Sequence, residues 1–224
     1  MNKFLTTLSV ILSSFALAGC SHVSKVKTVD KFATIEVQGK SSKNKVYYDD
    51  QLGNKGSVKT DDGSFYIDLP RKKSTTTIEI SANSNLSSAK KMSIPASKPI
   101  NSWSDYVTTY DSRNYGLPDS FENLTSGTHS TIFNGVKVTY YLDNGDLMAI
   151  RITSKTASVK QFAKVVSDVS TGTDFNYDFA KEKALKLGST DKPVKTLNGK
   201  WGDYDSFRYH CSNVYGNLSF DIFK

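Results

Sequence analysis

The chain has 224 residues and a formal net charge of +7, with 38% apolar and 23% charged residues. This composition excludes a disordered tail and a protein of many membrane spans, and two cysteines exclude a disulfide-rich scaffold. The basic balance alone points to a nucleic acid, a membrane surface or an acidic polymer as a partner.

Residues 1–19 have the pattern of an export signal. Lys3 supplies a positive charge, and residues 4–18 form a mostly apolar run, shorter than the roughly 20 residues of a spanning helix. The run ends in Leu17-Ala18-Gly19-Cys20, which resembles the lipobox of bacterial lipoproteins at all four positions. The resemblance implies cleavage between Gly19 and Cys20, a diacylglyceryl group on the Cys20 thiol and an extracytoplasmic, membrane-anchored protein. An ordinary secretory signal with a chance cysteine is the alternative.

Residues 20–31 are interpreted as the lipidated cysteine and a polar tether that carries Lys25, Lys27 and Lys31. The 11 residues after Cys20 reach at most about 40 Å when fully extended, so the first folded unit is expected near the membrane.

Residues 32–97 alternate short apolar runs with turns, at a spacing typical of a β-sandwich. The expected strands cover residues 34–37, 45–48, 56–59, 65–69, 75–82 and 91–94. The motifs Val37-Gln-Gly39, Asp62-Gly-Ser-Phe65, Leu69-Pro70 and Ile78-Glu-Ile80-Ser-Ala82 resemble those of small Ig-like domains of bacterial surface proteins. The resemblance covers roughly 65 residues and implies a fold without an activity. It departs at Arg71-Lys-Lys73, where such domains have a turn with glycine.

Residues 98–224 are predicted to form an α+β domain with an antiparallel sheet, without resemblance to a family and without an internal repeat. The whole chain is therefore expected to be mainly β, a sandwich followed by an α+β domain. Ser102 is expected to cap a helix that buries Trp103, Tyr106, Val107 and Tyr110, and a loop is expected over residues 111–129.

The predicted α+β domain continues with a hairpin around Asn144-Gly145, whose strands cover residues 136–142 and 147–153. A capping box of Ser158 and Gln161 begins a second helix, and a third covers residues 177–187. Three late strands are expected near residues 194–197, 206–211 and 218–223.

The sequence predicts no cofactor or metal site and no catalytic residue. Asp143-Asn-Gly-Asp146 favours a turn over a calcium loop, because it lacks EF-hand spacing. His22, His129 and His210 have no zinc-site spacing, and His129 with Asp119, Ser126 and Ser130 lacks any hydrolase signature. Cys211 is interpreted as a buried structural thiol. A dyad with His210 is disfavoured, because neighbours on a strand face opposite ways.

Two surfaces are candidates for binding. Trp201 and Tyr204 lie in an aromatic, acidic segment that suits stacking on a sugar or peptide, although a Trp that anchors a loop is the simpler interpretation. Residues 20–98 hold 14 basic and 8 acidic residues, whereas residues 99–224 hold 14 of each. The clusters, among them Arg71, Lys72 and Lys73, are either a solvated surface or attract anionic lipid head groups or acidic wall polymers. Nucleic acid is excluded as a partner outside the membrane.

The function expected from these features is a non-catalytic binding or adhesion module at the cell envelope, with a protein or glycan as ligand. The alternatives are an envelope hydrolase or transferase with an unrecognised site in residues 99–224, and an accessory lipoprotein of a transporter or cell-wall complex.

Overall fold

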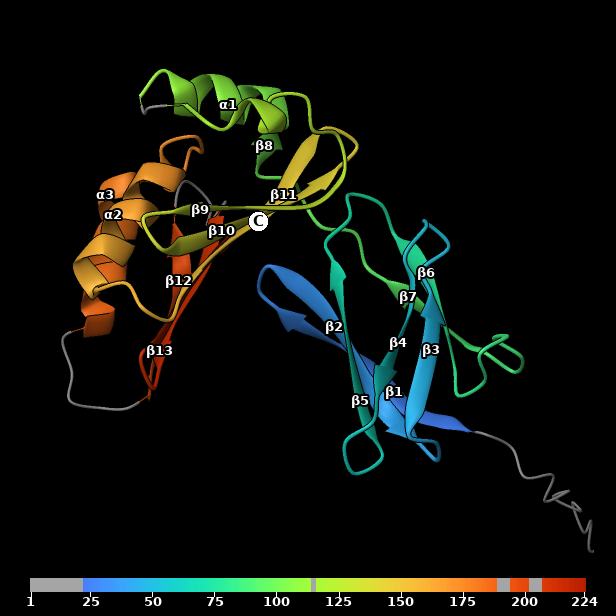
Figure 1. Cartoon of the computed structure of the whole chain (residues 1–224). Helices are drawn as coiled ribbons and strands as arrows, with labels where there is room; N and C mark the ends of the chain where they lie inside the picture. The colour runs from blue at the N-terminus through green and yellow to red at the C-terminus, as the bar shows by residue number, and fades with distance from the viewer. Residues whose placement is uncertain (1–21, 114–115, 189–193, 202–206) are drawn as a thin grey trace, which may run out of the picture.

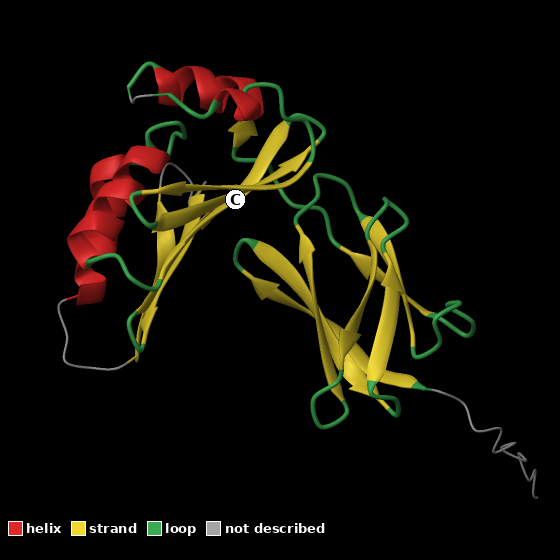
Figure 2. Ribbon diagram, in the orientation of Figure 1, coloured by secondary structure: helices red, strands yellow, loops and turns green. Residues whose placement is uncertain are grey.

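The computed structural model describes residues 22–113, 116–188, 194–201 and 207–224, which form three antiparallel sheets and three α-helices. Two sheets face each other in an N-terminal sandwich, and the third carries the helices of a C-terminal α+β domain (Figure 1; Figure 2). The predicted fold class, mainly β with an α+β part, is confirmed. No helix within these described ranges is long and apolar enough to cross a membrane.

The sandwich packs a three-stranded sheet, in the order β1-β2-β5, on a four-stranded sheet, in the order β4-β3-β6-β7. Its strands are β1 (Val23–Lys31), β2 (Thr34–Ser41), β3 (Lys45–Asp49), β4 (Lys55–Lys59), β5 (Ser64–Pro70), β6 (Thr76–Ser81) and β7 (Lys90–Ile94). Alternate residues such as Val37, Phe65 and Ile78 are fully buried between the sheets. The strands predicted from residue 34 onward are all present.

The tether predicted over residues 20–31 is wrong for residues 23–31, which form the edge strand β1. Its register with β2 runs from Val23 opposite Ser41 to Lys31 opposite Thr34. An irregularity between Ser24 and Lys27 interrupts the alternation, so the sequence hides the period of two that marks a strand. Lysines are common on edge strands, where they face solvent, and here they give the segment the composition of a polar linker.

The C-terminal sheet has the order β12-β13-β14-β11-β10-β9, and β8 also pairs with β11. Its elements are β8 (Asn101–Ser102), α1 (Trp103–Asp111), η1 (Asp119–Phe121), β9 (Gly127–Phe133), β10 (Val136–Asp143), β11 (Asp146–Ser154), α2 (Val159–Ser170), α3 (Tyr177–Leu185), η2 (Lys186–Gly188), β12 (Val194–Trp201), β13 (Phe207–Val214) and β14 (Asn217–Phe223). The predicted loop over residues 111–129 is wrong for η1 and the start of β9, and no strand was expected over residues 130–133, because the serines and threonines of β9 resemble a loop.

Local signals explain where these elements begin and turn. Ser102 caps α1 by accepting from the Asp105 amide, and both hydrogen bonds of the predicted capping box at Ser158 are present. The β10–β11 hairpin turns at Asn144 and Gly145, whose φ angles are +49° and +81°. Both residues therefore have the left-handed backbone that a two-residue hairpin turn requires, which confirms this prediction.

The C-terminal domain contains a structural repeat that the sequence does not display. In each half, helical segments precede three consecutive antiparallel strands, β9-β10-β11 in the first half and β12-β13-β14 in the second. The two halves join where β11 pairs with β14, so the third strands of both halves lie at the centre of the sheet. A fully paired centre leaves β9 and β12 as the two edges of this sheet.

The helices cover one face of the C-terminal sheet and form its core. The rings of Trp103 and Tyr106 stack with centroids 5.2 Å apart, and Tyr140 from the sheet meets both. The Tyr106 hydroxyl donates to the Val169 carbonyl at 3.1 Å, so this buried polar group is satisfied. Burial raises the pKa of Tyr106 well above its usual value, which keeps the phenol neutral.

The other face of the C-terminal sheet receives the tip of the β1–β2 hairpin (Figure 1). Phe32 stacks on His210 with ring centroids 3.7 Å apart, and Ala33 is fully buried beside Tyr141, Ala149 and Phe223. Phe32 has a φ of +65°, which is unusual for a bulky residue and costs about 1–2 kcal/mol. The stacking and the hydrogen bond from the Phe32 amide to Asp30, at 2.9 Å, hold it there.

Arg71 joins the two domains from beneath this tip. Its side chain is 3% exposed, pairs with Asp30 and donates to the Phe32 carbonyl. Its guanidinium carbon lies 4.8 Å from the Phe223 ring centroid, and that of Arg208 lies 4.7 Å from the same ring. Burial lowers the pKa of Arg71, and the charge of Asp30 opposes that shift. A buried cation with partners in both domains fixes their relative position.

We expect Arg71→Ala to lower the free energy of unfolding by about 2–3 kcal/mol, because it removes a buried cation and leaves Asp30 and the Phe32 carbonyl with fewer partners. Urea denaturation followed by circular dichroism measures this loss. The control is Lys91→Ala, which removes an exposed ion pair with Glu79 and should cost less than about 1 kcal/mol. Equal effects of the two variants would contradict the role given to Arg71.

Candidate functional site

The C-terminal sheet has one face that carries no helices, called here the open face. Cross-strand partners share a face, so the register defines its residues. Three rows cross the central strands: Arg208–Phe223–Ala149–Tyr141–Thr128, then His210–Asp221–Arg151–Thr139–Ser130, then Ser212–Ser219–Thr153–Lys137–Ile132. We name them the first, middle and outer rows. They become more exposed with distance from the sandwich, and the middle and outer rows are more polar than the first.

The hairpin tip covers the first row and part of the middle row. Phe32 lies on His210, and the Arg151 guanidinium donates to the Lys31 carbonyl at 3.0 Å. Arg151 also pairs with Asp221 at 2.8 Å. The pKa of Arg151 is raised above its usual value. Burial alone would lower this pKa, but the hydrogen bond to Asp221 and the charge of Asp221 outweigh that effect. Arg151 and Asp221 therefore pair with each other, and Arg151 also contacts the sandwich domain.

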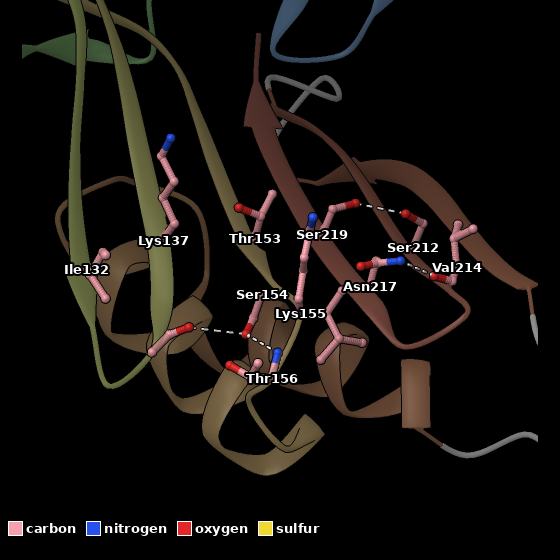
Figure 3. Close-up of a pocket in the computed structure, with 12 residues that line it drawn as sticks. Ile132, Lys137, Thr153, Ser154, Lys155, Thr156, Ser212, Val214, Asn217 and Ser219 are labelled. Carbon is pink, nitrogen blue, oxygen red and sulfur yellow. Dashed lines mark hydrogen bonds between the residues drawn. The ribbon is translucent and has the colours of Figure 1, made fainter.

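The outer row lies beyond the hairpin tip and forms a hollow of about 580 Å³ (Figure 3). Twelve described residues line it, from β9, the β9–β10 turn, β10, β11, β13, β14 and the loop after β11: Ile132, Gly135, Lys137, Thr153, Ser154, Lys155, Thr156, Ser212, Val214, Asn217, Leu218 and Ser219. None of the twelve is acidic. A volume of this size accommodates a small molecule or a few side chains of a larger partner.

The polar groups of the hollow are partly fixed. The hydroxyls of Ser212 and Ser219 lie 2.8 Å apart, and the Ser154 hydroxyl donates to the Gly135 carbonyl at 3.2 Å. The Thr153 hydroxyl, by contrast, has no hydrogen-bond partner among the described residues. Figure 3 shows Thr153 between the extended side chains of Lys137 and Lys155. Neither lysine pairs with a carboxylate in the described part of the chain, so the arrangement suits an anionic group.

The sequence-predicted binding surface at Arg71, Lys72 and Lys73 needs correction. Arg71 is buried, and the Lys72 ammonium lies 3.2 Å from Asp143 with its side chain 14% exposed. Lys73 donates its amide to Asp143 at 2.9 Å and its ammonium to Asp146 at 2.7 Å. These residues hold the two domains together, because long-range folding places the acidic β10–β11 turn beside them.

The same contacts bear on the Asp143–Asp146 segment. Its two carboxylates bind lysines of the sandwich, and no group of three potential metal ligands gathers in the described ranges. The geometry is that of the two-residue turn that the sequence favoured.

Of the two aromatic candidates, Trp201 lies apart from the hollow. Trp201 ends β12 half-buried, and its ring stacks on Phe179 of α3 with centroids 4.8 Å apart. This packing matches the simpler interpretation, a Trp that anchors the chain on the core. Tyr204, Gly19 and Cys20 lie outside the described residues.

The histidines and Cys211 do not gather into a catalytic arrangement in the described part of the chain. His129 contacts the Ser126 carbonyl at 2.8 Å, and no serine or threonine hydroxyl of the described residues bonds to a histidine ring. His210 lies under Phe32, with its Nδ1 3.7 Å from Asp221. Cys211 is fully buried on the opposite, helix-covered face, as the strand pattern predicts.

A second charged region lies at the end of the sandwich where β1 begins. Lys25, Lys27, Lys40, Lys43, Lys45 and Lys59 gather there, because Val23 pairs with Ser41 and Lys45 with Lys59. We call this group the basic pole. None of the six pairs with a carboxylate of the described residues, whereas Arg71, Lys72 and Lys73 at the other end all do. Lys25, Lys27 and Lys40 line one hollow with the exposed ring of Tyr66.

Sequence reasoning missed the hollow of the outer row. Alternation in Ile150-Arg-Ile-Thr153 and Val136-Lys-Val138 indicates which side chains face away from the core. It does not indicate that β14 lies beside β11, the pairing that places Ser219 next to Thr153. The local signal therefore identifies the residues of the face without locating the hollow.

Comparisons with known proteins found no matching family model, no matching curated protein and no matching solved structure.

We expect Cys211 to be inert toward thiol reagents in the folded protein. Burial raises the pKa of its thiol to about 12, so the reactive thiolate is scarce at pH 8. The measurement uses a Cys20→Ser chain and the release of thionitrobenzoate from Ellman's reagent. One thiol should react promptly in guanidinium chloride and almost none without it. Fast reaction of the native chain would show that Cys211 is accessible.

Proposed function

We propose that the chain is a lipid-anchored lipoprotein of the bacterial cell envelope and a non-catalytic binding module. Cys20 carries the anchor, the basic pole lies on the membrane surface, and the open face binds an anionic ligand. The observation that carries the proposal is that the basic pole, which holds the start of β1, and the open face lie at opposite ends of the described molecule.

The strand β1 supports this placement. Only Ser21 separates Cys20 from the first described residue, His22, and β1 begins at Val23. A strand of 9 residues rises about 30 Å, and its far end is the hairpin tip that contacts the C-terminal domain. An anchor at Cys20 therefore places the basic pole at the membrane and the C-terminal domain beyond it.

The basic pole suits anionic lipid head groups. Lysines without carboxylate partners keep their charge available, and each contributes about 1 kcal/mol of attraction near an anionic surface. The exposed Tyr66 beside Lys25, Lys27 and Lys40 adds an amphipathic ring of the kind enriched at membrane interfaces. Acidic wall polymers have the same charge chemistry and are the competing partner.

The hollow of the outer row suits ligand binding rather than chemistry on the ligand. It offers two lysines, the Thr153 hydroxyl, which has no partner among the described residues, and the apolar side chains of Ile132 and Val214. Its described lining residues include no histidine, carboxylate, cysteine or tyrosine, and the two cations complement a phosphate or carboxylate.

Replacing Cys20 by Ala should remove the lipid and release the protein from the membrane fraction. Cell fractionation with immunoblotting measures the location, and mass spectrometry of the N-terminal peptide measures the diacylglyceryl group. The matched control is Cys211→Ala, which keeps the anchor and should remain in the membrane fraction. Unchanged membrane retention of the Cys20→Ala chain would reject the anchor.

Charge reversal at the pole, Lys25→Glu with Lys27→Glu and Lys40→Glu, should weaken vesicle binding roughly 100-fold in the Cys20→Ala background. Co-sedimentation with phosphatidylglycerol-containing vesicles measures the affinity, and pure phosphatidylcholine vesicles give the background. The control with the same net charge reverses Lys160, Lys164 and Lys181 on the helices. Binding to soluble polyphosphate without binding to vesicles would assign the pole to an acidic wall polymer instead.

A further inference from the structure

The strand β9 differs from the other edge strands of the described structure. The edges of the three sheets are β1 and β5, β4 and β7, and β9 and β12. β1, β4, β7 and β12 each carry at least two lysines, and β5 carries Asp68 and Pro70. β9 reads Gly-Thr-His-Ser-Thr-Ile-Phe, without a lysine, a carboxylate or a proline. Charges and proline discourage the addition of a further strand, so β9 alone among these edges lacks such protection.

The backbone of β9 presents regular hydrogen-bonding groups to the outside. The β9–β10 hairpin turns at Asn134 and Gly135, and a two-residue turn is flanked by a hydrogen-bonded pair, here Phe133 and Val136. Pairs then alternate along an antiparallel ladder. The amide and carbonyl groups of Thr128, Ser130 and Ile132 therefore point away from β10. An added strand would find three residues with free backbone groups.

The same three residues direct their side chains onto the open face. Thr128, Ser130 and Ile132 are the β9 members of the first, middle and outer rows. Ile132 is 71% exposed and lines the hollow. The edge and the hollow are thus one continuous surface, and every second side chain of an added strand would face the open side.

The positive charge of the hollow indicates which kind of strand would add to β9. An added strand would lie about 10 Å from β10, a gap that a glutamate and the Lys137 side chain span together. Lys137 and Lys155 lack carboxylate partners in the described structure. A second copy of the chain would bring another β9, which contains no carboxylate for these lysines. An extended segment with carboxylates at alternate positions fits both the edge and the hollow.

We propose that β9 captures an extended acidic peptide segment of a partner protein, which adds to the sheet as a strand and directs its carboxylates to Lys137 and Lys155. This inference rests on the proposed function of the open face as a ligand site. Backbone hydrogen bonds to β9 supply affinity, and the hollow selects the side chains.

The test selects a phage-displayed library of random 12-residue peptides on the purified full-length chain. We expect the selected peptides to carry Asp or Glu at alternate positions. Ser130→Pro removes an outward amide, and Ser130→Ala is its matched control, since both lose the hydroxyl contact with Thr139. The peptides should bind Ser130→Pro at least tenfold more weakly than Ser130→Ala by fluorescence anisotropy. Lys137→Glu with Lys155→Glu should weaken binding at least tenfold, whereas Lys160→Glu with Lys181→Glu should not.

A ligand-side measurement avoids any dependence on folding of the proline variant. Methylating alternate backbone amides of a selected peptide should abolish binding in one register and spare it in the other, because only every second amide of a strand faces β9. Equal effects in both registers, or selected peptides without acidic enrichment, would overturn the inference. A dimer of the chain that Ser130→Pro dissociates would also overturn it, by assigning the edge to a second copy.

Different experimental results would reject strand addition to β9 and ligand binding by the open face. If inorganic phosphate or glutarate shifts the amide resonances of Thr153 and Ser219 while no acidic peptide is selected, the open face is a ligand site and strand addition to β9 is wrong. If neither probe binds, strand addition to β9 is wrong, and so is the part of the proposed function that makes the open face an anionic-ligand site.

Discussion

The stacking of Phe32 on His210, held by Arg71, is the contact on which the rest of the molecule depends. It requires a left-handed backbone conformation, which is unfavourable for an aromatic residue, at Phe32 in the tip of the β1–β2 hairpin. The surrounding groups compensate, because Asp30 and Arg71 satisfy the backbone of the tip. Through this one contact, β1 connects the basic pole, where the strand begins, to the C-terminal domain. The contact also decides which rows of the open face are covered and which stay exposed.

The two faces of the C-terminal sheet differ in polarity, and the hollow lies on the face without helices. Helix-facing positions such as Tyr140, Ile150 and Ile222 are apolar and fully buried, so the helices must cover them. Of the positions between them, Ala149 and Phe223 are apolar and lie under the hairpin tip, whereas most of the others carry hydroxyls or charges. Where the hairpin tip ends, the polar face remains open, and a hollow with two lysines results. The excess positive charge of residues 20–98 is also divided between two places. Lysines at the domain contact pair with carboxylates, whereas the lysines of the basic pole have no carboxylate partner among the described residues.

Local signals predicted most of the fold, and long-range contacts account for the rest. The capping box at Ser158 and the Asn144-Gly145 turn act within a few residues, so the sequence displays them directly. β1 was missed because an irregularity and three lysines obscure its alternation, and β9 because serines and threonines resemble a loop. The basic residues at Arg71–Lys73 were assigned to a binding surface, since no local pattern reveals that Asp143 and Asp146 fold against them. The hollow depends on the pairing of β11 with β14, which is equally non-local.

A distance measurement between the two domains tests the central claim, that the hairpin tip fixes them as one unit. Spin labels at Ser57→Cys in β4 and Lys160→Cys in α2, in a Cys20→Ala chain, lie on exposed positions, while the remaining Cys211 is buried. Double electron–electron resonance should give one narrow distance distribution, which Phe32→Ala broadens. A broad distribution in the chain that retains Phe32 would contradict a fixed arrangement and the placement of the open face that follows from it.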